Sequence, residues 1–339
     1  MHYALILLAD PGSEPDRQRN ARRCSIWFGA PRCDFAAGRA SASPHFDQST
    51  VNLLQRIFGR RPATAWEIEP GDIIWKLQPT PGGILVGEAR DVDRRTMSLF
   101  AMRPMEGKLL FSDVRLHDPW WVALEMTIGE VAILHAYPRP DLPNAAGATA
   151  VDCATGEVLW RDDGLRVLCG TQELALVQRG GSHDWSSLAL IDARSGVVLE
   201  EIGASPERTE AFQQTCAAVT EWPDWINSDT LDEDHPESGE IGPILDRLLP
   251  ARRRPVEIGR YAGYTVLGVH VPSRRSADAM LANLVDTHLL ILRDGRPVHQ
   301  EIVTEDAPGP SSDIFFIWNG VLIFIRNRRR LAGITLNND

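Results

Sequence analysis

The chain has 339 residues, of which 43% are hydrophobic, enough to bury a sizeable core. Its formal net charge of -11 argues against a broad nucleic-acid-binding surface, because neutralising phosphates requires a concentrated basic face. The cysteines are odd in number and lack CxxC spacing, so neither a disulfide framework nor a zinc site is indicated, and reduced thiols are expected. They are Cys24, Cys33, Cys153, Cys169 and Cys216.

The N-terminal part has no clear targeting or membrane-spanning segment. The run MHYALILLAD has a short apolar stretch with no basic region before it and no small-residue cleavage site, and no other stretch approaches the ~20 apolar residues of a membrane span. We therefore expect a cytoplasmic protein with no membrane segment. Residues 1–50 are rich in Arg, Ser, Ala, Gly and Pro, which predicts a disordered N-terminal extension or an over-extended start of translation.

A glycine-centred hairpin recurs along the rest of the chain. In GATAVDCATGEVLW, residues 147–160, an alternating apolar run precedes a turn with Gly156, and another apolar run follows it. The same pattern occurs at 98–111, 187–200 and 287–299, where Gly107, Gly196 and Gly295 occupy the turn. The segment 147–160 is therefore one copy of a repeated unit.

Each hairpin follows further strand-like runs, although the outer partner in the fourth repeat is less clear. These runs are Ile73 to Leu77, Ile84 to Ala89, Trp120 to Met126, Val131 to Ala136, Leu165 to Cys169, Leu174 to Gln178 and Tyr264 to Val271. Four short strands in each repeat predict the blades of an all-β β-propeller.

The ends of the repeat array predict how it closes. Three further strands are expected in 313–336, and the segment 63–70 supplies a fourth from the N-terminal side. Closure in this way hides open strand edges, so we predict a propeller domain over 60–339 with five four-stranded blades. Six or seven blades, or a pair of stacked sheets, remain alternatives.

The propeller is expected to carry a partly helical insertion at about 205–253. Residues 207–222 have helical spacing, an acidic loop follows, and a second short helix is predicted at 241–249. The acidic loop fails the EF-hand pattern, because Asp234 stands where the loop needs glycine. A solvated loop is predicted, and no metal site.

One repeat carries a recognisable motif. The pattern A-x-D-x-x-T-G-x-x-x-W occurs intact at Ala150, Asp152, Thr155, Gly156 and Trp160. It resembles the tryptophan-docking repeat of quinoprotein-like, or PQQ-repeat, β-propellers. The resemblance implies that the tryptophan packs between neighbouring blades while the Asp, Thr and Gly organise the turn.

The resemblance is weaker elsewhere. The copy at 189–200 keeps Asp192 and Gly196 but has Glu200 in place of the tryptophan. The run from Ile74 to Trp160, with GEARD, PWWVALE and LHAYPRPDLP in order, also resembles a family of uncharacterised bacterial propeller proteins over roughly 70–336. This second resemblance implies a fold and no settled activity.

The candidate ligand-binding residues are charged or aromatic groups within otherwise apolar strands. Glu88 and Arg90 share a strand face because they are two residues apart. Facing a central channel, they could bind a polar ligand together with Glu125, His135 and Tyr137. The alternative is that these groups pair with one another, since buried charges require partners whether or not they bind anything.

Trp120 and Trp121 are adjacent, so their rings point to opposite sides of a strand. A stacking platform for a sugar or quinone is one interpretation, and packing between blades is the other. The PRPDLP segment at 138–143 is a stiff turn that either shapes the mouth of the channel or simply connects two strands.

No catalytic motif is assembled in the sequence. Ser182-His183-Asp184 is no triad, because adjacent residues diverge in an extended chain, and no nucleophile elbow, phosphate loop or dinucleotide fingerprint occurs. We therefore predict a non-catalytic binding or scaffolding protein, without a cofactor, that recognises a protein partner or a small polar ligand. The alternative is a quinoprotein-like or carbohydrate-active enzyme with its site in the channel.

Overall fold

The computed structural model describes most of the chain beyond residue 63. The described residues are 26–27, 64–137, 145, 147–180, 187–203, 205–219, 224–277 and 283–336. They fall into two compact units, one holding Ile68–Trp225 and the other Ile226–Asp339 with the strand before Ile68. The predicted N-terminal extension lies outside the described residues apart from a two-residue strand, β1 (Ile26–Trp27).

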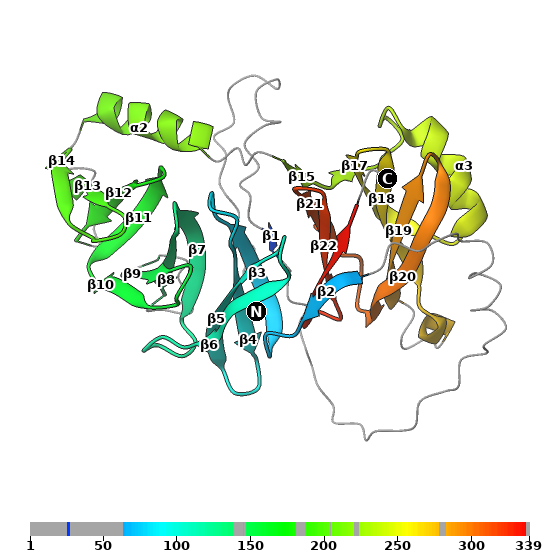
Figure 1. The fold of residues 1–339 in the computed structure, drawn as a ribbon, viewed down its shortest axis with the longest axis horizontal. Coiled ribbons are helices and arrows are strands. Elements are labelled where there is room, and N and C mark those ends of the chain that lie inside the picture. Colours follow the sequence, from blue (N-terminus) through cyan, green and yellow to red (C-terminus); the bar gives the residue numbers. More distant parts are fainter. Residues whose placement is uncertain are drawn as a thin grey trace. The chain divides into compact units, whose positions relative to one another are not determined.

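The unit Ile68–Trp225 contains three antiparallel sheets, which we call the first, second and third blades (Figure 1). The first blade is β3 (Ile73–Pro79), β4 (Leu85–Asp91), β5 (Thr96–Arg103) and β6 (Lys108–Val114), with β1 added beside β3. The second is β7 (Val122–Ile128), β8 (Val131–Ala136), β9 (Ala148–Asp152) and β10 (Val158–Asp162). The third is β11 (Leu165–Gly170), β12 (Leu174–Arg179), β13 (Leu188–Asp192) and β14 (Val198–Glu201).

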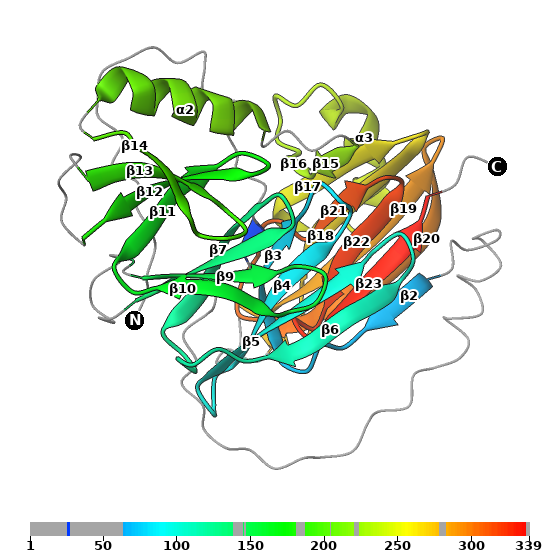
Figure 2. The same ribbon diagram turned by 60° about the vertical axis from the view of Figure 1, so that its left-hand side comes forward.

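The other unit contains two sheets, the fourth and fifth blades (Figure 2). The fourth is β17 (Arg253–Tyr261), β18 (Tyr264–Pro272), β19 (Val285–Arg293) and β20 (Arg296–Ala307), edged by β16 (Asp229–Thr230). The fifth has the order β15 (Trp225–Asn227), β21 (Phe315–Trp318), β22 (Val321–Arg326), β23 (Arg330–Thr335) and β2 (Thr64–Ile68). The prediction that an N-terminal strand completes the last blade is therefore confirmed.

The predicted all-β propeller blades are confirmed, with five sheets in the described part of the chain. The first four blades run as meanders in chain order, and each of the four predicted hairpins forms the two outer strands of one of them. All four turn glycines have positive φ, at 61°, 77°, 72° and 71° for Gly107, Gly156, Gly196 and Gly295, a conformation that costs other residues free energy.

Within the unit Ile68–Trp225, successive blades pack face to face. In β8, Ala132 and Leu134 join an apolar cluster shared with the first blade, whereas Val131 and Ile133 join a cluster shared with the third. A strand buried on both faces needs a continuous apolar run, which explains the sequence VAIL. Because the second blade packs on both faces against a different sheet, the two-sheet sandwich alternative is wrong for this unit.

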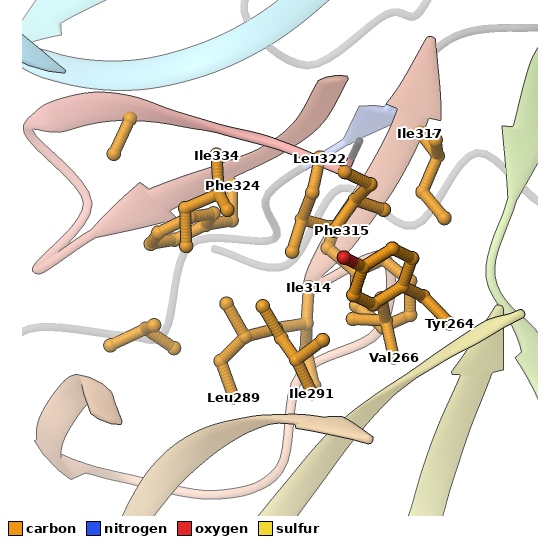
Figure 3. Close-up of a cluster of buried hydrophobic side chains, with 13 residues drawn as sticks. Tyr264, Val266, Leu289, Ile291, Ile314, Phe315, Ile317, Leu322, Phe324 and Ile334 are labelled. Carbon is orange, nitrogen blue, oxygen red and sulfur yellow. The ribbon is translucent and has the colours of Figure 1, made fainter. Parts of the chain in front are cut away.

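The fourth and fifth blades share a larger core. Phe315 and Phe324 of the fifth blade pack with Leu289 and Ile291 of the fourth, and Tyr264 closes one side of the cluster (Figure 3). These side chains are nine-tenths buried or more, so their contact stabilises the unit through the hydrophobic effect.

The tryptophan motif docks one blade on the next. Trp160 Nε1 donates a hydrogen bond to the Ala193 carbonyl at 2.9 Å, and the indole lies against Gly196, where a Cβ would come within 3.0 Å of the ring. Asp152 organises its own turn by accepting hydrogen bonds from the backbone of Ala154 and Thr155, each at 2.9 Å. Trp160 therefore packs between the second and third blades, and Asp152 organises the turn of its own hairpin.

The third blade lacks the docking tryptophan. Glu200 stands where the tryptophan would be and forms an ion pair with Arg208 of α2 (Pro206–Val219). Phe212 of this helix packs on the apolar face of the third blade with Leu176 and Leu188. Within this unit, α2 therefore covers the face on which a following blade would pack.

The remainder of the segment 205–253 belongs to the other unit. The helix α3 (Ser238–Leu248) buries Ile241 and Leu245 against the fourth blade. Glu233 and Glu237 of the acidic loop form ion pairs with Arg254 and Arg260 of β17. The loop is thus tied to its own blade. Among the described residues, no group of His, Cys, Asp and Glu could hold a metal ion.

Polar contacts fasten β2 to the fifth blade. Glu67 forms ion pairs with Arg326 and Arg330, and Arg326 also pairs with Glu301 at 2.7 Å. Trp66 lies against Gly333, where any Cβ would meet the indole ring. No helix in the described part of the chain is long and apolar enough to cross a membrane.

Candidate functional site

Glu88 and Arg90 form a buried ion pair on the first blade. Both lie on β4, and Arg90 Nε donates to Glu88 Oε1 at 2.5 Å. Glu88 is fully buried and the Arg90 side chain is 11% exposed. The two residues thus pair with each other, as the alternative interpretation of the sequence held.

Arg90 is held on every side by groups of the same unit. Its two terminal nitrogens donate to the carbonyls of Trp120 and Val122 at 3.0 and 2.7 Å. The guanidinium also lies over the rings of Trp75 and Trp120, 5.5 and 5.0 Å from their centroids. Trp120 therefore forms a cation–π contact with Arg90 of the protein itself, as Trp75 does.

The second oxygen of Glu88 bridges to the second blade. Glu88 Oε2 accepts a hydrogen bond from the Leu124 N–H at 2.7 Å, where the register of β7 shifts at a β-bulge after Leu124. A bulge takes a backbone group out of the strand ladder, and a buried N–H without a partner is costly. Glu88 supplies that partner.

His135 makes the equivalent contact between the second and third blades. It lies on β8, as Glu88 lies on β4, and its Nε2 accepts from the Val167 N–H at 3.1 Å. Strand β11 shifts register directly after Val167. In both cases the second strand of a blade sends one acceptor side chain to the bulged first strand of the next blade. This repeated role accounts for polar residues in otherwise apolar strands.

Glu125 occupies the bulge of β7. Its carbonyl oxygen accepts hydrogen bonds from Lys76 Nζ at 2.7 Å and from Gln78 Nε2 at 3.3 Å. Lys76 is only 2% exposed, yet it lies in the apolar strand β3. The backbone of the bulge is therefore bound to the first blade, while the Glu125 side chain is half-buried.

A more accessible group of side chains lies at the end of β7 and β8. Trp121 is 41% exposed, and the Tyr137 N–H donates to its carbonyl at 2.8 Å, which continues the pairing of the two strands. The Tyr137 hydroxyl donates to Glu125 Oε2 at 3.4 Å. We call Trp121, Glu125 and Tyr137 the Tyr137 cluster.

The electrostatics of the Tyr137 cluster involve the third blade as well. Burial raises the pKa of the Tyr137 hydroxyl, and the negative charges of Glu125 and Glu88 raise it further, whereas Arg166 of β11 lowers it. The phenol therefore remains a hydrogen-bond donor across the physiological pH range. Tyr137 and Glu125 bring a phenol and a carboxylate together, the backbone of Trp121 pairs with that of Tyr137, and the exposed Arg166 acts on Tyr137 through its charge.

The His135 imidazole is neutral at physiological pH. Burial lowers its pKa from 6.5 to about 4, against the opposing charge of Glu125. Its Nε2 can accept from Val167 only in the unprotonated form. Protonation would therefore place a positive charge in a buried site and break the hydrogen bond with Val167.

Stability is expected to depend on pH through His135. Between pH 4 and 6.5 the unfolded chain binds more protons than the folded one, so the free energy of unfolding rises with pH across this window. At pH 5 the loss relative to pH 8 is about 2 kcal/mol from this residue. Urea unfolding at the two pH values checks it. His135→Gln keeps an acceptor without titrating, so an equal pH difference in this variant would contradict the expectation.

Several predicted features cannot be placed. The PRPDLP turn at 138–143 and Ser182-His183-Asp184 lie outside the described residues. The other candidates, from Glu88 to Tyr137, all lie in the unit Ile68–Trp225. The structure brings them into two groups, the Glu88–Arg90 pair with Trp120, and the Tyr137 cluster, whose Glu125 also acts on His135 through its charge.

Trp75, Lys76 and Arg166 were not among the site residues predicted from the sequence. A signal for Lys76 existed, because it is one of only two lysines and interrupts the apolar run IIWKL. The role of Trp75 follows only from the structure, since the ring packs on an arginine from the neighbouring strand. Arg166 follows a buried leucine in β11 and gave no separate signal.

The comparisons with known proteins give one family match and no activity. Residues 80–160 match a family model described as a domain of unknown function, DUF4905. This span contains every candidate residue from Glu88 to Tyr137 and the tryptophan-docking motif. A search of curated protein sequences finds no significant match.

Several solved structures resemble the chain at low identity and low TM-score. BamB from Moraxella catarrhalis is 10% identical, with 81% of this chain and 87% of that chain covered and a TM-score of 0.30. The β-propeller domain of the Trilobed protease from Pyrococcus furiosus is 10% identical, with 78% and 68% covered and a TM-score of 0.26. AztD from Citrobacter koseri is 13% identical, with 76% and 71% covered and a TM-score of 0.23.

Proposed function

We propose that this chain is a non-catalytic binding protein whose Tyr137 cluster recognises a small polar ligand with a flat apolar face, such as a sugar. The observation that carries the proposal is the combination of a 41% exposed indole, Trp121, with a phenol donor and a carboxylate from the adjoining strand positions. Indole faces stack on the apolar side of a sugar ring, and carboxylates accept from its hydroxyls.

The enzyme alternative has less support. A general acid or base needs a titratable group free to exchange protons with a substrate. Glu88 is fully buried and its two oxygens accept from Arg90 and Leu124, and His135 accepts from Val167 with its pKa lowered by burial. These groups bind the blades together, which favours a binding role over hydrolysis or quinone chemistry.

Two further features belong to this proposal. A quinoprotein-like repeat is supported by the docking of Trp160 on the turn of the next blade. A cytoplasmic location is supported by the absence of a membrane-spanning helix in the described residues, and cell fractionation with an antibody to the chain would test it.

The binding proposal is tested with a panel of common mono- and disaccharides, using tryptophan fluorescence and isothermal titration calorimetry. At least one sugar is expected to bind, and Trp121→Ala is expected to weaken it at least tenfold, roughly 1.4 kcal/mol. Glu125→Gln is expected to weaken it as well, because an amide accepts less strongly than a carboxylate.

The control is Val158→Ala, which alters another exposed apolar side chain, 52% exposed on β10. It should leave binding unchanged. Absence of binding across the panel would contradict a sugar as the ligand. Binding that is unchanged in Trp121→Ala would show that the Tyr137 cluster is not the binding site. Hydrolysis of a bound disaccharide that Glu125→Gln abolishes would favour the enzyme alternative.

A further inference from the structure

Helix α2 places a cysteine against the third blade. Phe212 and Cys216 are four residues apart, so they lie on the same face of the helix. Phe212 packs on the apolar cluster of Leu176 and Leu188, and Cys169 of β11 packs against the same cluster. Figures 1 and 2 both show α2 running beside the sheet β11–β14.

The two thiols meet at this contact. The Cys216 side chain hydrogen-bonds that of Cys169, and the cysteines are reduced in this structure. Cys216 is 5% exposed, whereas Cys169 is half-buried. A small oxidant therefore reaches Cys169 first, with the second sulfur already in contact with it.

The hydrogen bond also divides the roles of the two sulfurs. It raises the pKa of the Cys216 thiol, and burial raises it further, so Cys216 keeps its proton and donates. An S–H donor stabilises negative charge on its acceptor. Cys169 is also the more exposed of the two, so it is the sulfur that attacks, and Cys216 is the one that resolves the product.

We propose that Cys169 and Cys216 form a peroxide-sensitive thiol pair that locks helix α2 onto the third blade as a disulfide. The Cys169 thiolate attacks one oxygen of a hydroperoxide, the O–O bond breaks, and water or an alcohol leaves after protonation. The resulting sulfenic acid then condenses with the Cys216 thiol, which forms the S–S bond and releases water. Each peroxide accepts the two electrons that the thiol pair gives up.

The position of the bond gives it a structural effect. It joins the first strand of the blade to the helix that follows its last strand, so the loop that it closes, residues 170–215, contains β12, β13 and β14. In the reduced protein, α2 is held by side-chain packing and the Glu200–Arg208 ion pair, both side chains of which are about half exposed. Exposed ion pairs contribute little stability, so oxidation decides how firmly the helix is held.

The experiment treats the full-length reduced protein with hydrogen peroxide, blocks remaining thiols, and maps tryptic peptides without reduction. A disulfide between peptides 167–179 and 209–247, which contain Cys169 and Cys216 as their only cysteines, is the expected product. Hydrogen exchange of the α2 amides should slow by about tenfold on oxidation and recover with dithiothreitol. Cys169→Ser and Cys216→Ser should each abolish both effects, and Cys153→Ser is the matched control that should abolish neither.

Two results would overturn the proposal. One is the recovery of Cys169 and Cys216 as separate thiols or sulfinic acids after peroxide treatment, without the cross-linked peptide. The other is a cross-link that forms but leaves the exchange rates in α2 unchanged.

Discussion

Replacing Glu88 by alanine is expected to lower the free energy of unfolding by about 3–5 kcal/mol. The change leaves the Arg90 guanidinium, 11% exposed, without its carboxylate, and it leaves the Leu124 N–H without an acceptor. Removing one partner of a buried ion pair costs more than the pair itself contributes, because the remaining charge stays desolvated. Chemical denaturation monitored by circular dichroism measures the loss.

Two variants separate the causes of this loss. Glu88→Gln keeps an oxygen acceptor for Leu124 and removes the charge, so its cost should be smaller than that of alanine. Arg94→Ala removes an arginine that pairs with Asp91 on the surface, 80% exposed, and should change stability by less than about 0.5 kcal/mol. A loss below about 1 kcal/mol in Glu88→Ala would show that the pair does not hold the first two blades together.

The pairing of Glu88 with Arg90 could be predicted from the sequence. Their separation by two residues put both side chains on one face, and an apolar strand made a partner necessary. The hydrogen bonds from Glu88 and His135 to the next blade could not be predicted, because they depend on bulges after Leu124 and Val167. A bulge is set by pairing with a distant strand, and nothing in the local residues marks it.

The hairpins show what local sequence does predict. Gly156 and Gly196 stand at turns that need positive φ, and flanking apolar alternation gave the strands their faces. Strands β15 and β16 were not predicted, because runs of three and two residues exist only through pairing with β21 and β17. Helix α3 begins at Ser238, three residues before its predicted start, in a segment whose Ser, Gly and Pro favour a loop.

For function, the sequence identified the polar residues but not their accessibility. Trp120 and Trp121 are neighbours with similar local surroundings, yet one stacks on Arg90 and the other is 41% exposed. Strand alternation predicts only that they face opposite ways. Which side meets a neighbouring blade follows from the packing of whole sheets, so the choice of Trp121 as a ligand platform needed the structure.

The third blade has Glu200 at the position that the tryptophan occupies in the repeat of the second blade. In the second blade, Trp160 reaches the turn of the third, whereas in the third blade Glu200 reaches Arg208 of α2. A carboxylate at this place suits a half-exposed helix surface, whereas the indole of Trp160 packs on the turn at Gly196. The loss of the tryptophan therefore marks the point within this unit where a helix replaces blade packing.

The docking contact itself is expected to contribute strongly to stability. Trp160→Ala should lower the free energy of unfolding by about 3 kcal/mol, because it removes the indole from the turn at Gly196 and leaves the Ala193 carbonyl without its donor. Trp160→Phe keeps a ring without the N–H and should cost about 1 kcal/mol. Trp121→Ala is the matched control, expected to cost less than about 1 kcal/mol because Trp121 is 41% exposed. Equal losses in Trp160→Ala and Trp121→Ala, measured by urea denaturation, would mean that the tryptophan repeat does not join the second and third blades.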